Sequence, residues 1–432
     1  MMVNYHKVIF VLVLILFTVS CTDNNGNLKN YREKSKKATQ LSSRIQKSNH
    51  YTYYIPKDSS IEGVLIIMDP HGKPNLVLDS LHSFSDQNHL ALLGLKEIEN
   101  GISNYNSIIK RDLQHFLSLN NLHNMKIYLL GFSGAARMAL IYSQRNRING
   151  LIVCGAGLHR QTSLPFPTVM ISGLSDFNFI EQYYTSDSPR TFNRNSIAIH
   201  FKGKHQWPPI YVLDDAIQFI INRNSGKGSS NSRYYEDLSK KYYSEKEYFL
   251  SFKSMEVAYK LCSVEDIKTM RKKLVSLSND TKVKLYFQRQ NKYLSEEQKR
   301  YQMLSESLEV QDLKWWNNQI NYIIDKSNSN KNELAAQSYS RTLAYLGILM
   351  YSRLNAVSAG RGHYDLFPKY LSIYEKLEPD NPDLYFFKGI YAYTQGRQDE
   401  SKQYLKKSLQ LGFTDKAKMN KYFSQDFLYG IL

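Results

Sequence analysis

Cysteine is scarce in this sequence, with three among 432 residues. Cys21 ends an N-terminal apolar segment, whereas Cys154 stands in an apolar run and Cys262 in a helical stretch of a different expected domain. No cysteine spacing typical of a metal site is present, and a disulfide across two domains is not favoured. We therefore expect two buried free thiols, and neither a disulfide framework nor a structural metal site.

Long hydrophobic runs are also lacking. The run VIFVLVLILF, residues 8–17, is too short for a stable membrane-spanning helix. It follows a basic start and precedes TVSC at residues 18–21, which predicts a secretory signal peptide over residues 1–20. The TVSC ending resembles a bacterial lipobox, which implies that Cys21 is diacylated and becomes the new N-terminus. Because Thr18 stands where Leu is usual, a soluble secreted protein cut nearby is the alternative.

The residues that follow contain few large apolar side chains. Residues 22–49 carry seven Lys or Arg, so we expect a polar tether over residues 21–49. Two or three acyl chains on Cys21 would anchor the protein firmly to a membrane of the bacterial cell envelope, either in the periplasm or at the surface.

Acidic residues are few relative to basic residues. The chain has 39 Asp and Glu against 56 Lys and Arg, for a formal net charge of +17. The basic residues are spread along the chain, and no nucleic-acid-binding motif accompanies them. We therefore expect a generally basic surface and no nucleic-acid partner.

Between residues 50 and 223, short apolar runs alternate with helical stretches. Strands that are apolar throughout are buried on both faces, as in a parallel sheet covered by helices. Helices are expected at residues 105–119, 134–145 and 210–222. The pattern predicts an α/β fold with a mostly parallel sheet, whose ligand site lies beyond the carboxyl ends of the strands. The expected strands are YTYYI, VLIIM, LALLGL, KIYLLGF, NGLIVCGAG, TVMISG and SIAIHF.

The chain changes character after residue 223. A Gly/Ser-rich stretch at residues 224–232 predicts a linker, and a helical region is expected over residues 233–335. Over residues 336–432 the sequence contains a weak internal repeat, because AYLGILMY and FFKGIYAY align with Gly347 over Gly389, 42 residues apart.

The second copy of this repeat resembles the tetratricopeptide repeat. Gly389 occupies the small inter-helix position and Gly396 the turn. The resemblance implies helix pairs that stack into a surface for a peptide or protein partner. A helical cap that only packs on its neighbours is an equally good interpretation.

The segment GFSGA, residues 131–135, stands between an expected strand and an expected helix. In a nucleophile elbow the residues two before and two after the serine are small, and Gly131 and Ala135 meet this need around Ser133. Small residues also occur wherever a helix packs tightly on a strand, so this segment alone leaves both interpretations open.

Two further residues decide between these interpretations. Asp176 follows the strand TVMISG, and His205 follows the strand SIAIHF. Taken singly, Asp176 could be a helix N-cap and His205 an ordinary loop residue. The order serine, acid, histidine, each on a loop after a strand, favours a catalytic triad of Ser133, His205 and Asp176.

These motifs resemble the α/β-hydrolase superfamily, in particular dienelactone hydrolases and polyhydroxybutyrate-depolymerase-like esterases. The matching segments are DPHGKP, LGLKEIENG, GFSGAAR, GLSDFNF and GKHQWPP. The resemblance implies a serine hydrolase that cleaves an ester or amide through an acyl-enzyme, without a metal or organic cofactor. Its substrate would be an acylated or small molecule.

The resemblance also implies an oxyanion hole made of backbone N–H groups. One donor would be Gly134, and the second would be Gly72 or Lys73. Glu97 and Glu99 could face the cleft or belong to a solvated loop. Since Ala135 replaces the second glycine of the elbow, a catalytically inactive scaffold that binds a partner through its helical repeats is the alternative function.

Overall fold

The computed structural model describes residues 45–56, 60–157, 164–186, 195–225, 231–329, 332–429 and 431. The expected signal peptide, Cys21 and most of the tether lie outside these residues, as does most of the Gly/Ser-rich stretch. The chain divides into two compact units, of which the first ends at Leu294 and the second begins at Ser295. No helix in the described ranges combines the length and apolar character that a membrane crossing needs.

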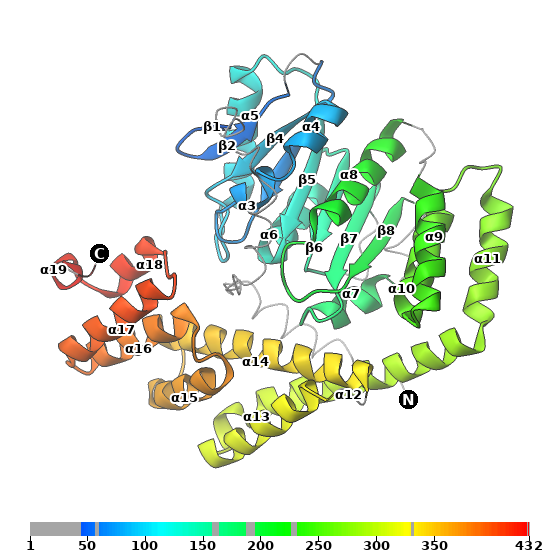
Figure 1. Cartoon of the computed structure of the whole chain (residues 1–432). Coiled ribbons are helices and arrows are strands. Elements are labelled where there is room, and N and C mark those ends of the chain that lie inside the picture. Colours follow the sequence, from blue (N-terminus) through cyan, green and yellow to red (C-terminus); the bar gives the residue numbers. More distant parts are fainter. Residues whose placement is uncertain are drawn as a thin grey trace. The chain divides into compact units, whose positions relative to one another are not determined.

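An eight-stranded sheet forms the centre of the first unit (Figure 1). Its order is β1-β2-β4-β3-β5-β6-β7-β8; β1 and β2 pair antiparallel, β2 and β4 pair antiparallel, and the other pairs are parallel. The expected α/β fold class with a mostly parallel sheet is therefore confirmed. The strands are β1 (Gln46–Lys47), β2 (Tyr51–Tyr54), β3 (Gly63–Met68), β4 (Leu90–Leu95), β5 (Lys126–Phe132), β6 (Gly150–Cys154), β7 (Thr168–Gly173) and β8 (Ser196–Phe201).

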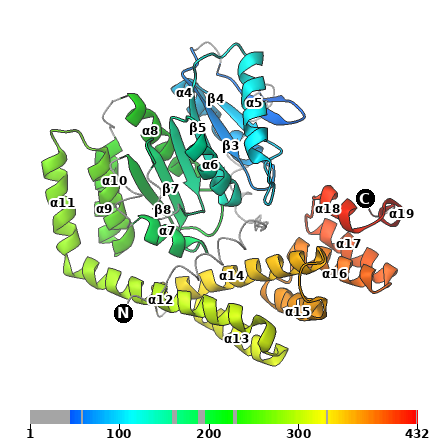
Figure 2. The ribbon, with the colours of Figure 1, turned by 180° about the vertical axis from the view of Figure 1, so that it is seen from behind.

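Both faces of the sheet are covered, as the continuous apolar runs require. Leu65 and Ile67 of β3 belong to one hydrophobic core, and Val64 and Ile66 belong to the other. Figures 1 and 2 show the sheet from its two sides. One core includes residues of α5 (Tyr105–Leu119) and α6 (Ser133–Arg145). The other includes residues of α3 (Asn75–Leu78), α4 (His82–Asn88) and α8 (Ile210–Ser225).

The second of these cores continues past residue 223, where the sequence led us to expect the end of the domain. It includes Tyr235 of α9 (Asn231–Ser244) and Met255 and Ala258 of α10 (Tyr248–Leu261). These two helices are therefore part of the packed α/β unit. They are followed by α11 (Ile267–Asn279) and the long α12 (Thr281–Val310), within which the first unit ends.

A buried histidine on β8 lies under α10. The His200 ring centroid is 4.9 Å from that of Phe249, and its Nδ1 is 2.6 Å from the Ser172 hydroxyl. Its Nε2 is buried and has no hydrogen-bond partner within the described residues. Burial, together with the nearby positive charge of Lys253, holds the pKa of His200 well below its usual range.

We expect this histidine to make the fold acid-sensitive. Below about pH 6.5 the unfolded chain binds a proton at His200 that the folded chain does not, so stability falls with pH by up to about 1.4 kcal/mol per unit. His200→Phe keeps the ring contacts and should remove this part of the pH dependence of the free energy of unfolding. The lost hydrogen bond with Ser172 lowers stability equally at every pH, so it does not change that dependence. Urea unfolding followed by circular dichroism at pH 7.5, 6.5 and 5.5 tests this. Equal slopes for both proteins would contradict it.

The second unit is helical in its described residues. It contains the C-terminal part of α12 and two helix pairs that coincide with the internal repeat. A Cβ added at Gly389 would lie 2.9 Å from Leu405 Cδ2, and one at Gly347 would lie 2.1 Å from Glu378 Oε1, so both repeated glycines lie at close approaches. The pairs are α14 (Glu333–Ser358) with α15 (Phe367–Leu377), and α16 (Pro382–Thr394) with α17 (Gln398–Gln410).

The two pairs differ in their connections. Residues 359–366, including a short 3₁₀ helix (Tyr364–Leu366), join α14 to α15, whereas α16 turns into α17 within residues 395–397, with Gly396 at φ +73°. This longer connection contributes to the separation of 42 residues between Gly347 and Gly389. Tetratricopeptide-like repeats remain a prediction for these helices. The remaining helices are α13 (Leu313–Ser327), α18 (Lys416–Tyr422) and α19 (Gln425–Leu428).

The two cysteines in the described residues are free. Cys154 is buried in the sheet, and this burial raises the pKa of its thiol well above the usual range. Cys262 is only partly buried, because it follows the last residue of α10. The expectation of buried thiols therefore holds for Cys154 and is wrong for Cys262.

Candidate active site

Ser133 stands at the junction of β5 and α6 in an unusual backbone conformation. Its φ is +52°, in the left-handed region that non-glycine residues rarely adopt, whereas Phe132 before it is extended. A Cβ on Gly131 would lie 2.7 Å from the Cα of Ala136, so a larger residue there would collide with the helix. The turn is therefore as sharp as a nucleophile elbow requires, and Ala135 fits at its second small position, fully buried.

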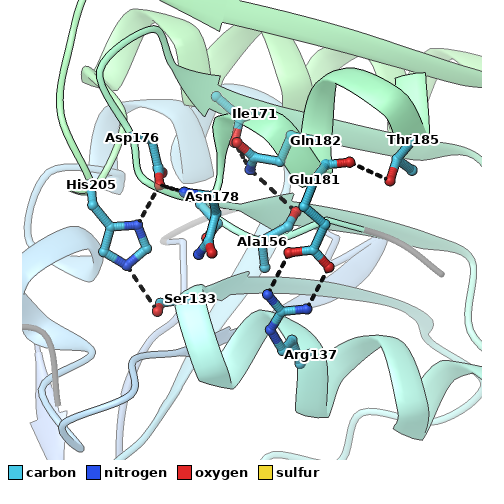
Figure 3. A network of polar contacts seen from close by, with 11 residues as sticks. Ser133, Arg137, Ala156, Ile171, Asp176, Asn178, Glu181, Gln182, Thr185 and His205 are labelled. Carbon is cyan, nitrogen blue, oxygen red and sulfur yellow. Dashed lines mark hydrogen bonds and ion pairs between the residues drawn. The ribbon is translucent and has the colours of Figure 1, made fainter. Parts of the chain in front are cut away.

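The structure brings Ser133, His205 and Asp176 together at the carboxyl ends of β5, β7 and β8 (Figure 3). His205 Nε2 is 2.9 Å from the Ser133 hydroxyl, and His205 Nδ1 is 2.9 Å from Asp176 Oδ1. The side chains of His205 and Asp176 are 6% and 1% exposed. A hydroxyl, an imidazole and a buried carboxylate thus form one hydrogen-bonded chain, the arrangement that activates a serine.

Packing fixes the imidazole of His205 from several sides. Its ring centroid lies 4.3 Å from that of Phe177 and 4.8 Å from that of Phe132. Gly155, at φ +62°, leaves room for it, because a Cβ there would be 3.1 Å from His205 Cε1. Asp176 Oδ1 also accepts a hydrogen bond of 2.7 Å from the Asn178 N–H, which orients the carboxylate. The ring therefore has little freedom to leave the serine.

The expected oxyanion donors differ in their availability. The N–H of Gly134, in the first turn of α6, has no acceptor in the part of the chain that the structure describes. The expectation for Gly72 is wrong, because its N–H donates to the carbonyls of Asp69 and Ile98, at 3.2 and 3.0 Å. The Lys73 N–H is 3.3 Å from Asp69 Oδ1, at the long end of hydrogen-bond distances.

The acidic loop after β4 contains Glu97, which forms ion pairs, and Asn100, which packs against Gly134. Glu97 pairs with His50 and Arg111, and the hydrogen bonds from His50 and then Arg111 lower the pKa of its carboxyl. Asn100 covers the elbow, since its Oδ1 lies 1.9 Å from where a Cβ on Gly134 would stand. Glu97 thus belongs to a surface network, while the Glu99 backbone pairs with His71.

An ion pair next to the triad was not foreseen from the sequence. Arg137, one turn after Ser133 on α6, donates two hydrogen bonds of 2.8 and 2.6 Å to Glu181 (Figure 3). Burial alone would lower the pKa of Arg137, but the Glu181 carboxylate raises it overall, so the guanidinium stays charged. Glu181 lies on α7 (Phe179–Ser186), so the pair ties α6 to the segment that follows Asp176.

Within the ranges that the structure describes, no group of three or more His, Cys, Asp or Glu side chains is arranged to hold a metal ion.

Comparison with known proteins gives structural likeness only. No protein-family model matches the sequence, and no curated protein matches it. A putative α/β hydrolase from Agrobacterium tumefaciens is similar at 15% identity and TM-score 0.34, over 42% of this chain and 96% of its own. A serine hydrolase homologue from Coxiella burnetii is similar at 16% identity and TM-score 0.32, over 41% of this chain and 95% of its own. The poly(3-hydroxybutyrate) depolymerase LpqC from Bordetella parapertussis is similar at 11% identity and TM-score 0.29, over 40% of this chain and 82% of its own.

Proposed function

We propose that this protein is a serine hydrolase that cleaves an ester or amide bond through an acyl-enzyme. The observation that carries the proposal is the hydrogen-bonded chain from Ser133 through His205 to Asp176, with its serine on a strained turn. Backbone strain of this kind costs on the order of 1–3 kcal/mol and persists where the surroundings enforce it, which is typical of functional sites.

The proposed reaction follows from the roles that this geometry allows. Ser133 Oγ attacks the substrate carbonyl while His205 Nε2 takes its proton, and Asp176 stabilises the imidazolium that forms. His205 then returns the proton to the leaving group, which leaves an acyl ester on Ser133. Water, activated by the same imidazole, hydrolyses that ester and restores the serine.

The negative charge on the substrate oxygen needs backbone donors. We propose the Gly134 N–H as one of them. On the loop after β3, the Gly72 N–H is already used by two carbonyls, and the Lys73 N–H can serve as a second donor only if it gives up its 3.3 Å contact with Asp69 Oδ1.

Labelling with a fluorophosphonate probe tests the activated serine directly. We expect the full-length mature protein to be labelled, and Ser133→Ala and His205→Ala to abolish labelling. Ser143→Ala, a buried serine on the same helix, is the matched control and should label as the wild type does. A well-folded wild type that takes no label would contradict the proposal and favour the inactive scaffold.

The cellular setting is a separate proposal that rests on the sequence. We propose that Cys21 carries a lipid anchor at the bacterial cell envelope and that the helix pairs after residue 333 bind a peptide or protein partner. Metabolic labelling with a fatty-acid analogue, compared between wild type and Cys21→Ala, tests the anchor. A label retained in Cys21→Ala would contradict it.

A further inference from the structure

Asp69, the first residue after β3, holds two loops of the site at once. Its Oδ1 accepts hydrogen bonds from the N–H groups of His71, at 2.8 Å, and Lys73, at 3.3 Å. Its Oδ2 accepts one of 2.8 Å from the indole Nε1–H of Trp207. Trp207 lies two residues after His205, so a single carboxylate joins the loop after β3 to the loop that carries the base.

The link continues from Trp207 to the imidazole through an aromatic ring. The Phe132 ring centroid lies 5.2 Å from that of Trp207 and 4.8 Å from that of His205. Phe132 itself precedes Ser133. The indole that Asp69 holds therefore packs on the same side chain that supports the base and leads into the nucleophile.

The chemistry of Asp69 suits this position. Its side chain is almost completely buried, and no Lys or Arg of the described residues forms an ion pair with it. A buried carboxylate without a cation is costly unless N–H groups satisfy it, and three do so here. An ionised carboxylate only accepts hydrogen bonds, so it can face N–H donors from both loops, which a carboxamide cannot.

We propose that Asp69 is a positioning residue for the reaction proposed above. Its carboxylate fixes the loop after β3 through the His71 and Lys73 N–H groups, and through Trp207 and Phe132 it sets the angle of His205. This inference rests on the proposed function. Asp69 itself touches no reacting atom.

The substitution Asp69→Asn tests the role with little change of shape. A carboxamide has one acceptor oxygen and one NH₂ group, so its NH₂ must face either the Trp207 N–H or the backbone N–H groups. Two donors then face each other and one hydrogen bond is lost. We expect fluorophosphonate labelling to slow by roughly 10- to 100-fold, because lost hydrogen bonds to a charged group in a buried site have effects of this order. Asp112→Asn, an equally buried carboxyl on α5, is the matched control and should label at the wild-type rate.

A double-mutant cycle separates positioning from general damage. Trp207→Phe removes the indole donor, so the amide introduced by Asp69→Asn no longer opposes it, and we expect Asp69→Asn with Trp207→Phe to label faster than the product of the two single effects. Trp207→Phe alone should slow labelling several-fold. It also keeps the test decisive if Asp69→Asn does not fold. The thermal unfolding temperature of each variant tests whether its labelling rate merely follows its stability.

The outcomes distinguish this inference from the function on which it rests. Wild-type protein without label overturns the proposed function and this role together. Labelled wild type with equally fast Asp69→Asn, or single effects that simply multiply in the double variant, overturns the positioning role alone. Slow Asp69→Asn with recovery in the double variant supports it.

Discussion

Asp176→Asn is expected to slow the reaction of Ser133 on the order of 10⁴-fold without unfolding the protein. The amide carries no charge to stabilise the imidazolium, and it can hold the wrong tautomer of His205. Its oxygen can still accept the 2.7 Å hydrogen bond from the Asn178 N–H, so the loop should keep its shape. The rate of fluorophosphonate labelling, measured under pseudo-first-order conditions, gives the effect directly.

Asp237→Asn is the control for this substitution, because Asp237 is exposed on α9 and far along the chain from the triad. Circular dichroism before labelling shows whether each variant is folded. A folded Asp176→Asn protein that labels within tenfold of wild type would show that the 2.9 Å contact with His205 does not orient the base, and another group would have to do so.

The sheet and the meeting of Ser133, Asp176 and His205 could be predicted because their signals are strong and local. Runs such as VLIIM are apolar at successive positions, which few structures other than a doubly covered strand accommodate. A serine, an aspartate and a histidine that follow three of the parallel strands then lie close together, because the carboxyl ends of parallel strands meet at one edge of the sheet.

Helix α7 was missed because its sequence has little helical signal of its own. FIEQYYTS is short and contains aromatic and hydroxyl side chains with modest helix propensity. Tertiary contacts support it instead, since the Gln182 amide donates to the carbonyls of Ala156 and Ile171. Without α7, the partner of Arg137 could not be foreseen.

The expectation for Gly72 failed for a different reason. Spacing places the HGK turn near the site, but it does not say where each N–H points. The residue that directs them was visible in the sequence, because an aspartate that begins a turn commonly accepts the N–H two residues later. The domain boundary expected at residue 223 was placed too early for a similar reason. A Gly/Ser-rich stretch predicts a linker, but it does not tell whether the next helix packs on the domain, and the burial of Tyr235 depends on residues elsewhere in the chain.

A buried ion pair in the second unit gives the largest expected effect on stability. Arg341 donates to Glu297 at 2.6, 2.9 and 3.2 Å, and Tyr301 donates to the same carboxylate at 2.7 Å. The side chains of Arg341 and Glu297 are 4% and 0% exposed. Arg341→Met would leave the carboxylate buried with the Tyr301 hydroxyl alone, and we expect a loss of about 3–5 kcal/mol in the free energy of unfolding.

The readout can be confined to the second unit. Of the three tryptophans, only Trp207 lies in the first unit, so in a Trp207→Phe background the fluorescence of Trp315 and Trp316 follows the second unit during urea unfolding. Arg353→Met, on the same helix, is the control. Its contact with Glu309 is 3.9 Å long and partly exposed, so its loss should cost no more than about 1 kcal/mol.

Replacing the whole group decides whether the pair stabilises the fold or merely must not be broken. When Glu297→Leu, Tyr301→Phe and Arg341→Met are combined, no buried charge is left without a partner, and we expect stability to return to near the wild-type value or to exceed it. A triple variant as unstable as Arg341→Met alone would show that apolar side chains cannot fill this space. A mild Arg341→Met variant would contradict the expected loss and show that the Glu297 carboxylate finds another partner, because a buried charge left without one is costly.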